Sequence, residues 1–125
     1  MHDEEDIVRD HYRGFEGEPE IQFVRHLPDG RQIILRMWDG YFDAIMNLVE
    51  PSVDGWNGLA LPYHLDTGWY EESPWEVKNL SEVSDQVCEI DESLLDQQVQ
   101  SVLEDMRSLL GQALEAGDHV FILYC

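Results

Sequence analysis

A run of apolar residues at helical spacing limits what this chain can fold into more than any other feature of its sequence. Between residues 95 and 113, apolar side chains recur every three or four positions, and most of the side chains between them are polar or charged. This spacing places an apolar stripe along one face of a helix, which must therefore pack against another element. The stripe consists of Leu95, Val99, Val102, Met106, Leu109 and Ala113, and it is flanked by Leu94, Leu103, Leu110 and Leu114.

The two ends of this predicted helix carry capping residues, and a strand follows it directly. The side chain of Asp91 or Ser93 can accept hydrogen bonds from the first N–H groups, and Gly117 can close the last turn. Gly111 costs about 1 kcal/mol relative to alanine, which the burial of such a stripe offsets. Residues 120–124 are apolar on both faces, which indicates a central strand.

Residues 20–38 predict a β-hairpin. Apolar side chains alternate with other side chains on both sides of a Pro28-Asp29-Gly30 sequence. Pro28 fixes the backbone angle of the first turn position, and Gly30 supplies the positive φ that a bulged connection needs. One face of the hairpin is apolar and the other is mixed, which is expected when helices cover only one side of a sheet.

Three shorter elements are predicted between the hairpin and the long helix. Asp39 can cap a helix that Pro51 ends. Residues 59–65 are typical of a strand, and Pro62 places this strand at an edge because proline has no N–H to donate. A further helix of one or two turns is predicted from Ser81, which can act as its cap.

Together these elements predict an α+β fold. We expect helices to pack on one face of a small, mainly antiparallel sheet, formed by the N-terminal hairpin and the C-terminal strand. The length of 125 residues fits a single domain over residues 1–125. Residues 1–19 are acidic and interrupted by glycine, and we expect them to form a short helix or a loose arm.

The charge balance limits the classes of partner. The chain has 27 acidic and 7 basic side chains, with a formal net charge of -20. Its hydrophobic fraction of 43% is too high for a disordered acidic chain. Direct binding of nucleic acid is not expected, because such binding uses many Lys and Arg side chains to neutralise phosphates. A basic protein is the natural partner of so acidic a domain.

The cellular compartment is predicted from the cysteines and from the hydropathy pattern. Cys88 and Cys125 form no close pair, so a disulfide framework has no support and a reducing cytoplasm fits best. The first ten residues do not resemble a signal peptide, and no apolar run is long enough to span a membrane. We therefore expect a cytoplasmic protein that does not contact membranes.

No motif predicts catalysis, a cofactor or a metal. The acidic run at residues 3–6 lacks the alternation of a calcium loop, and nothing near Cys88 activates its thiol. The sequence has no nucleophile elbow, no phosphate-binding glycine loop and no dinucleotide fingerprint. The histidines do not have the spacing of a zinc site; they are His2, His11, His26, His64 and His119. We therefore expect a protein that is not an enzyme.

The stretch from Leu65 to Val77 is the strongest candidate for a binding surface. It contains three large aromatic side chains among four acidic ones, namely Asp66, Trp69, Tyr70, Glu71, Glu72, Trp75 and Glu76. In one interpretation the tryptophans fill the core and the acids simply face water. In the other, the aromatic side chains anchor a partner and the acids complement its basic surface. Both hold if one tryptophan points inward, and Trp56, Tyr63 and His64 then extend the same surface.

The chain resembles the small acidic immunity proteins that bacteria pair with polymorphic toxins, including those of contact-dependent growth inhibition systems. The features that carry the resemblance are the stretch from Gly68 to Glu76, the hairpin, the acidic excess and the C-terminal strand that ends in Tyr124-Cys125. The resemblance implies a cytoplasmic protein that is not an enzyme. It implies a cognate toxin domain as partner, often a nuclease, whose active site or substrate groove is blocked in a 1:1 complex.

Two other classes of function stay open from the sequence. An acidic mimic of nucleic acid, or an adaptor, would inhibit several unrelated basic proteins and would bind them less tightly as salt rises. A small enzyme would contain a pocket with carboxylates or histidines of perturbed pKa. An immunity protein differs from both because it discriminates sharply in favour of its own toxin.

Overall fold

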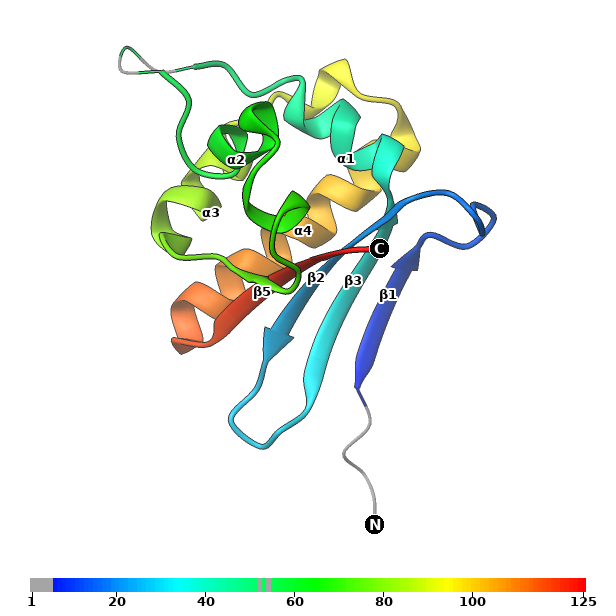
Figure 1. Cartoon of the computed structure of the whole chain (residues 1–125), viewed down its shortest axis with the longest axis vertical. Helices are drawn as coiled ribbons and strands as arrows, with labels where there is room; N and C mark the ends of the chain where they lie inside the picture. The colour runs from blue at the N-terminus through cyan, green and yellow to red at the C-terminus, as the bar shows by residue number, and fades with distance from the viewer. Residues whose placement is uncertain (1–5, 52, 54) are drawn as a thin grey trace.

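A computed structural model describes residues 6–51, 53 and 55–125, and in this part of the chain five strands form one sheet with the order β1-β3-β2-β5-β4 (Figure 1). The strands are β1 (Ile7–His11), β2 (Glu20–His26), β3 (Gln32–Trp38), β4 (Trp75–Glu76) and β5 (His119–Tyr124). The helices over the same residues are α1 (Asp39–Met46), α2 (Ala60–Leu65), α3 (Leu80–Cys88) and α4 (Gln97–Ala116), with 3-10 turns η1 (Gly68–Tyr70) and η2 (Glu92–Leu94).

The helices lie over one face of the sheet, with α4 running behind the strands in Figure 1. The register of the strands explains this, because it aligns Phe23 of β2 with Leu35 of β3 and with Ile122 of β5 on the same face. All three side chains are at most 1% exposed, and the apolar stripe of α4 packs over them. The predicted α+β class is confirmed.

The sheet is mixed, which corrects the expectation of a mainly antiparallel sheet built on an N-terminal hairpin. β2 and β3 pair antiparallel around a turn in which Gly30 has a φ of 93°. β1 joins the far side of β3 in parallel, with Ile7 beside Ile33 and His11 beside Met37. The segment expected to be a short helix or a loose arm therefore contributes a strand at residues 7–11; residues 1–5 lie outside the described residues.

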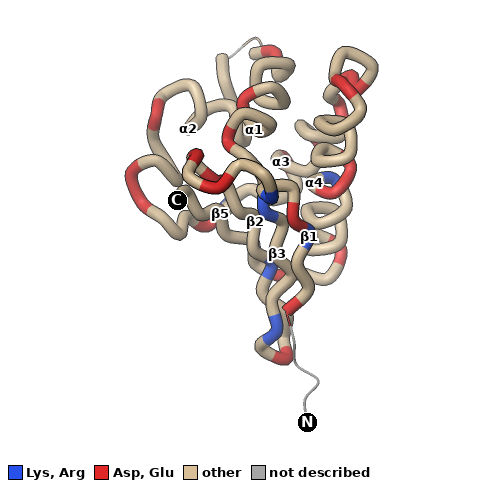
Figure 2. Tube along the Cα trace, turned by 90° about the vertical axis from the view of Figure 1, so that its right-hand side faces the viewer, with Lys and Arg blue, Asp and Glu red and all other residues tan. Residues whose placement is uncertain are grey.

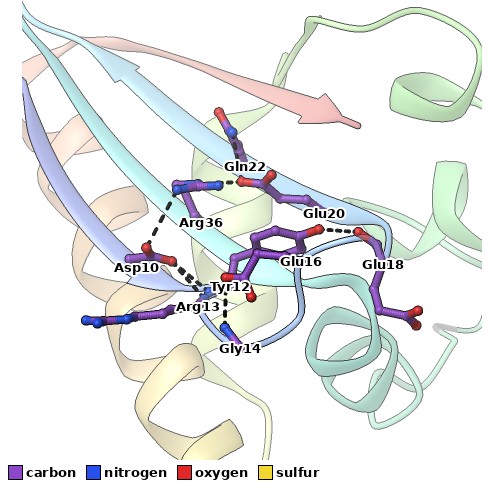
Figure 3. Close-up of polar contacts among 9 residues, drawn as sticks. All are labelled: Asp10, Tyr12, Arg13, Gly14, Glu16, Glu18, Glu20, Gln22 and Arg36. Atoms are coloured by element: carbon purple, nitrogen blue, oxygen red, sulfur yellow. Dashed lines mark hydrogen bonds and ion pairs between the residues drawn. The ribbon is translucent and has the colours of Figure 1, made fainter.

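Polar contacts attach β1 to the rest of the fold. The His11 ring nitrogen Nε2 lies 2.7 Å from a carboxylate oxygen of Asp105 on α4. On the opposite, open face of the sheet, Arg36 of β3 contacts Asp10 of β1 at 3.6 Å and donates to Glu20 of β2 at 2.5 Å (Figure 3). One arginine thus connects three neighbouring strands, a link that the hydrophobic pattern of β1 does not reveal.

The predicted caps of two shorter helices, α1 and α3, are wrong. Asp39 is the first residue of α1, but the N-cap is Trp38 and no side chain caps this helix. The N-cap of α3 is Asn79 and not Ser81, again without a side-chain hydrogen bond. Residues 60–65 form α2 and not an edge strand, because Pro62 lies in the first turn of the helix, where its N–H is not needed.

The long helix agrees with its predicted stripe and differs at its start. Asp96 caps α4 by accepting from the N–H of Val99, whereas Asp91 caps the preceding turn η2. The end is as predicted, since Gly117 adopts a left-handed φ of 77°. β5 has a neighbouring strand on both sides, as its apolar faces indicate. In the described ranges, no helix is both long and apolar enough to cross a membrane.

Candidate functional site

The predicted binding segment connects α2 to β4 and includes η1, which contacts α2 and β5. Trp69 of this segment is 1% exposed and packs against Phe42, Tyr70 and Trp75, with ring centroids 5.4 to 5.5 Å away. Trp69 is therefore a core residue and is not available as an anchor for a partner. The interpretation as a core residue therefore holds for Trp69, and a binding surface can be formed only by the other residues of the segment.

The acids of the segment face outward. Asp66 ends α2 in a left-handed conformation with a φ of 55° and is exposed. Glu71 and Glu72 follow η1 and are also exposed. Glu76 is half-buried, and one of its carboxylate oxygens lies 2.8 Å from Nδ1 of His119 on β5. Three of the four predicted carboxylates are thus free to meet a partner without first breaking an ion pair with another described residue.

An apolar cleft opens beside this segment, and we call it the tryptophan cleft. Its volume is about 400 Å³, and it lies between α2 and the stretch from β4 to α3. Four large side chains define it, namely Trp56, Leu61, Leu65 and Trp75. Leu61 is 44% exposed and Leu65 is 58% exposed. Such a concave apolar patch is the kind of feature in which interface hot spots form.

Residues 56–59, which include Trp56, are held by contacts with α2 and α3. The Trp56 ring stacks on His64 of α2, with the ring centroids 3.9 Å apart. The Gly58 N–H donates to a Glu82 carboxylate oxygen at 3.1 Å, and the Leu59 N–H donates to the Gln86 side chain at 2.9 Å. Because both acceptors belong to α3, the wall of the tryptophan cleft is pre-formed, which lowers the entropy cost of binding.

Gly68 allows the chain to turn close beneath the tryptophan cleft. Its φ is 66°, which residues with a side chain rarely adopt. A Cβ at this position would lie 2.8 Å from Cβ of Pro62 and 3.3 Å from the ring of Trp75. The glycine is therefore required both by the backbone conformation and by the packing of the cleft.

Positive charge is unevenly distributed along the chain. Five arginines lie between residues 9 and 36, on the sheet and its connections, whereas only Lys78 and Arg107 follow Arg36 in the sequence. Figure 2 shows basic positions mainly along the strands and acidic positions along the helices and their connections. Arg107 donates to the carbonyl oxygens of Val87 and Ile90 at the end of α3, so its charge is already engaged. The helical layer is thus the more acidic side of the molecule.

A second group of titratable side chains lies between α1, α2, η1 and β5. Burial, with a contribution from Asp43, raises the pKa of Asp39 to about 6, and one Asp39 oxygen is buried without a hydrogen bond. Asp43 accepts from the Tyr63 hydroxyl at 2.8 Å. Burial also raises the pKa of Tyr70 to about 12. Perturbed carboxylates often mark active sites, but neither Asp39 nor Asp43 lines the tryptophan cleft.

The described residues contain no group of three or more His, Cys, Asp or Glu side chains that could hold a metal ion. Comparisons with protein-family models, with curated proteins and with solved structures give no match for this chain. Fold class by itself does not determine function, which depends on the residues of the site.

Sequence reasoning missed the leucines of the tryptophan cleft. Leu61 and Leu65 are four residues apart, which places both on one face of a helix, but the assignment of a strand to residues 59–65 hid this spacing. The signal available in the sequence was Pro62 itself, because proline is favoured near the start of a helix. Trp56, Tyr63 and His64, to which the predicted surface could extend, are joined by ring contacts, and of the three only Trp56 lines the cleft.

Proposed function

We propose that this protein is an inhibitor that binds a basic protein partner through the tryptophan cleft and the acids around it. The observation that carries this proposal is the position of three exposed carboxylates, those of Asp66, Glu71 and Glu72, in the segment that borders an apolar cleft with two tryptophans in its walls. An apolar side chain of the partner would fill the cleft, and its Lys and Arg side chains would meet the carboxylates.

The partner that we propose is a toxin domain, and the protein is then its immunity protein in the cytoplasm. The resemblance to acidic immunity proteins motivates this choice, and the charge agrees with it independently. A nuclease needs a basic surface to bind phosphates, so an acidic domain can occupy the same surface and exclude the substrate. A stoichiometric 1:1 complex follows from this mode of inhibition, with no catalytic step by the immunity protein.

The first experiment uses the large reading frame directly upstream of the gene for this chain. Its C-terminal domain is expressed alone and together with this protein, and growth and complex formation are measured. The proposal expects that the domain arrests growth, that this protein binds it one to one and that growth recovers. If the domain is toxic and this protein neither binds it nor restores growth, the immunity proposal is wrong.

Two charge-reversal variants locate the contact surface on the complex. Glu71→Lys with Glu72→Lys changes the proposed surface, whereas Glu104→Lys with Glu115→Lys makes the same change of net charge on exposed positions of α4. We expect the first variant to weaken binding by at least 2 kcal/mol, about thirtyfold, and the second to weaken it much less. Equal losses would instead favour the acidic mimic, which depends on overall charge and not on one surface.

Trp75 is the anchor whose removal tests the tryptophan cleft itself. Trp75→Ala removes one wall of the cleft, and a loss on the order of 2 kcal/mol in binding is expected. Because Trp75 also packs on Trp69, the folding of the variant is checked by circular dichroism and thermal unfolding. Leu65→Ala provides a second variant, since Leu65 is 58% exposed and contributes little to the core. Unchanged affinity in both folded variants would exclude the cleft as the contact site.

A further inference from the structure

A second concave surface lies next to the tryptophan cleft, and we call it the acidic groove. It has a volume of about 880 Å³ and runs between residues 48–51 and the helix α3 with the turn that follows it. Five carboxylates line it, those of Glu50, Glu82, Asp85, Glu89 and Asp91. Among the described residues that line it there is no Lys, Arg or His.

The carboxylates of the acidic groove are largely without counter-charges. Glu50, Asp85 and Glu89 are exposed, and none of their side-chain carboxylates has a hydrogen bond or ion pair with another described residue. Asp91 accepts hydrogen bonds from the backbone and side chain of Ser93, which lower its pKa and keep it ionised. Glu82 accepts from the Gly58 N–H. Five negative charges on one concave surface repel one another, and a cationic chain that enters the groove would relieve this repulsion.

The acidic groove and the tryptophan cleft are adjacent. Asn57, Asn79 and Glu82 line both of them, so the two hollows meet at these residues. The groove also has apolar contacts to offer, because Leu48, Val49 and Ile90 line it. A segment that spans both hollows would meet the apolar walls of the cleft, whose lining also includes Lys78, and then the carboxylates of the groove.

We infer that the acidic groove and the tryptophan cleft together bind one segment of the partner, in which an apolar side chain is followed by a run of Lys and Arg. The apolar side chain enters the cleft between Trp56 and Trp75, and the basic run lies along Asp85 and Glu89. This inference rests on the proposed function for the existence of a basic protein partner. It specifies the chemical features of the partner that are recognised, an apolar side chain and a basic run. A small polyamine has no apolar side chain and would not satisfy both parts of the surface.

The test uses synthetic probes and the full chain, so it does not depend on finding the partner. The probe is the peptide acetyl-Leu-Gly-Lys-Arg-Lys-Arg-amide, and its control replaces Leu by Gly. Binding is measured by calorimetry and by amide chemical shifts at about 0.15 M salt, where the Debye length of about 8 Å suppresses long-range attraction. We expect the shifts to concentrate at the Trp56 and Trp75 indoles and at residues 82–91, and the control peptide to bind at least fivefold more weakly.

Variants of the protein test the groove separately from the cleft. Asp85→Asn with Glu89→Gln should weaken the probe at least fivefold, whereas Glu104→Gln with Glu115→Gln on α4 should change its affinity less than twofold. All four positions are exposed, so these variants leave the core unchanged. Spermidine should not reproduce the shifts at the indoles. Equal effects of the two double variants, or shifts centred on the outer face of α4, would overturn the inference.

The two proposals fail in different ways. If the probe binds as expected but the upstream domain is neither toxic nor bound, the groove inference stands and the immunity proposal falls. If the toxin domain binds and growth recovers, but Asp85→Asn with Glu89→Gln changes neither the affinity for the toxin domain nor that for the probe, the immunity proposal stands and the groove inference falls.

Discussion

At the scale of single residues, the fold contains one carboxylate whose burial opposes its charge. Asp39 lies at the start of α1, where the helix dipole favours a negative charge, yet burial raises its pKa to about 6. Desolvation is therefore the larger effect here. Because the pKa in the folded state lies above the ordinary value, folding is favoured when Asp39 is protonated, and this contribution is lost as pH rises from about 4 to about 6.

Replacing Asp39 by asparagine should therefore stabilise the protein at neutral pH. We expect the free energy of unfolding of Asp39→Asn at pH 7 to rise by about 1 kcal/mol, a value discounted because part of the side chain remains in water. Urea unfolding at pH 5 and pH 7 measures this effect and its loss at the lower pH. Glu104→Gln is the control, since it also removes one negative charge but from an exposed position. An equal gain in both variants would show that net charge, and not burial of Asp39, is responsible.

The ion pair between Glu20 and Arg36, on the open face of the sheet, stabilises the fold, whereas the charge on Asp39 destabilises it. The Glu20 side chain is 10% exposed, and its hydrogen bond to Arg36 is the largest cause that raises the pKa of Arg36 (Figure 3). Arg36→Met would leave the Glu20 carboxylate buried without a cation. We expect a loss of about 2 kcal/mol in unfolding free energy, below the range for fully buried pairs because Arg36 is 33% exposed.

A double-mutant cycle by urea unfolding checks this assignment. The variant with both Glu20→Met and Arg36→Met should recover most of the stability that Arg36→Met loses, because the uncompensated charge is then removed as well. If the double variant is less stable than Arg36→Met, packing of the two long side chains and not their charges accounts for the loss.

At the scale of elements, two possible capping residues differ in whether they form a capping hydrogen bond. Asp96 accepts the Val99 N–H and begins α4, whereas Ser81 lies just inside α3 without a capping hydrogen bond. Asp96→Ala should therefore cost about 1 kcal/mol, and Ser81→Ala should change stability by less than about 0.5 kcal/mol. Thermal unfolding of both variants measures the difference. A larger loss in Ser81→Ala would mean that Ser81, and not Asn79, caps α3.

Elements with a strong repeating pattern could be predicted from the sequence, and those fixed by distant contacts could not. The stripe of α4 and the alternation of β2 and β3 are local patterns, so their type followed from spacing alone. β1 has exposed apolar residues and is held by Asp105, more than ninety positions away. α2 was hidden by Pro62, which is compatible with the first turn of a helix as well as with an edge strand.

The residues of the candidate site could be predicted from the sequence, but the direction in which each side chain points could not. The segment from Leu65 to Val77 combines acids with large aromatic residues, and this could be read directly from the sequence. Which tryptophan is buried depends on α1, since Trp69 packs against Phe42 and this contact joins distant parts of the chain. The tryptophan cleft arises where α2 meets the stretch from β4 to α3, and the acidic groove arises where residues 48–51 meet α3 and the turn after it. No single stretch of sequence therefore encodes either of them.

At the scale of the whole molecule, the net charge of -20 acts on folding and on binding in opposite directions. Like charges on a small domain repel one another in the folded state, and salt screens this repulsion. Salt also screens the attraction between the acidic surface and a basic partner. One quantity, the ionic strength, is therefore expected to raise the stability of the free protein and to weaken the proposed complex.

We predict that the melting temperature of the free protein rises, on the order of 5 °C, when sodium chloride is increased from about 0.01 M to about 0.5 M. The Debye length falls over this range from about 30 Å, which is about the diameter of a typical small domain, to a few ångströms, so most of the mutual repulsion disappears. The partly buried pair of Arg25 and Asp118 resists screening and should not reverse the trend. A variant with lysine at positions 71, 72, 104 and 115 carries less negative charge and should show a smaller salt effect. An equal rise in this variant would assign the effect to salt acting on apolar surface and not to charge repulsion.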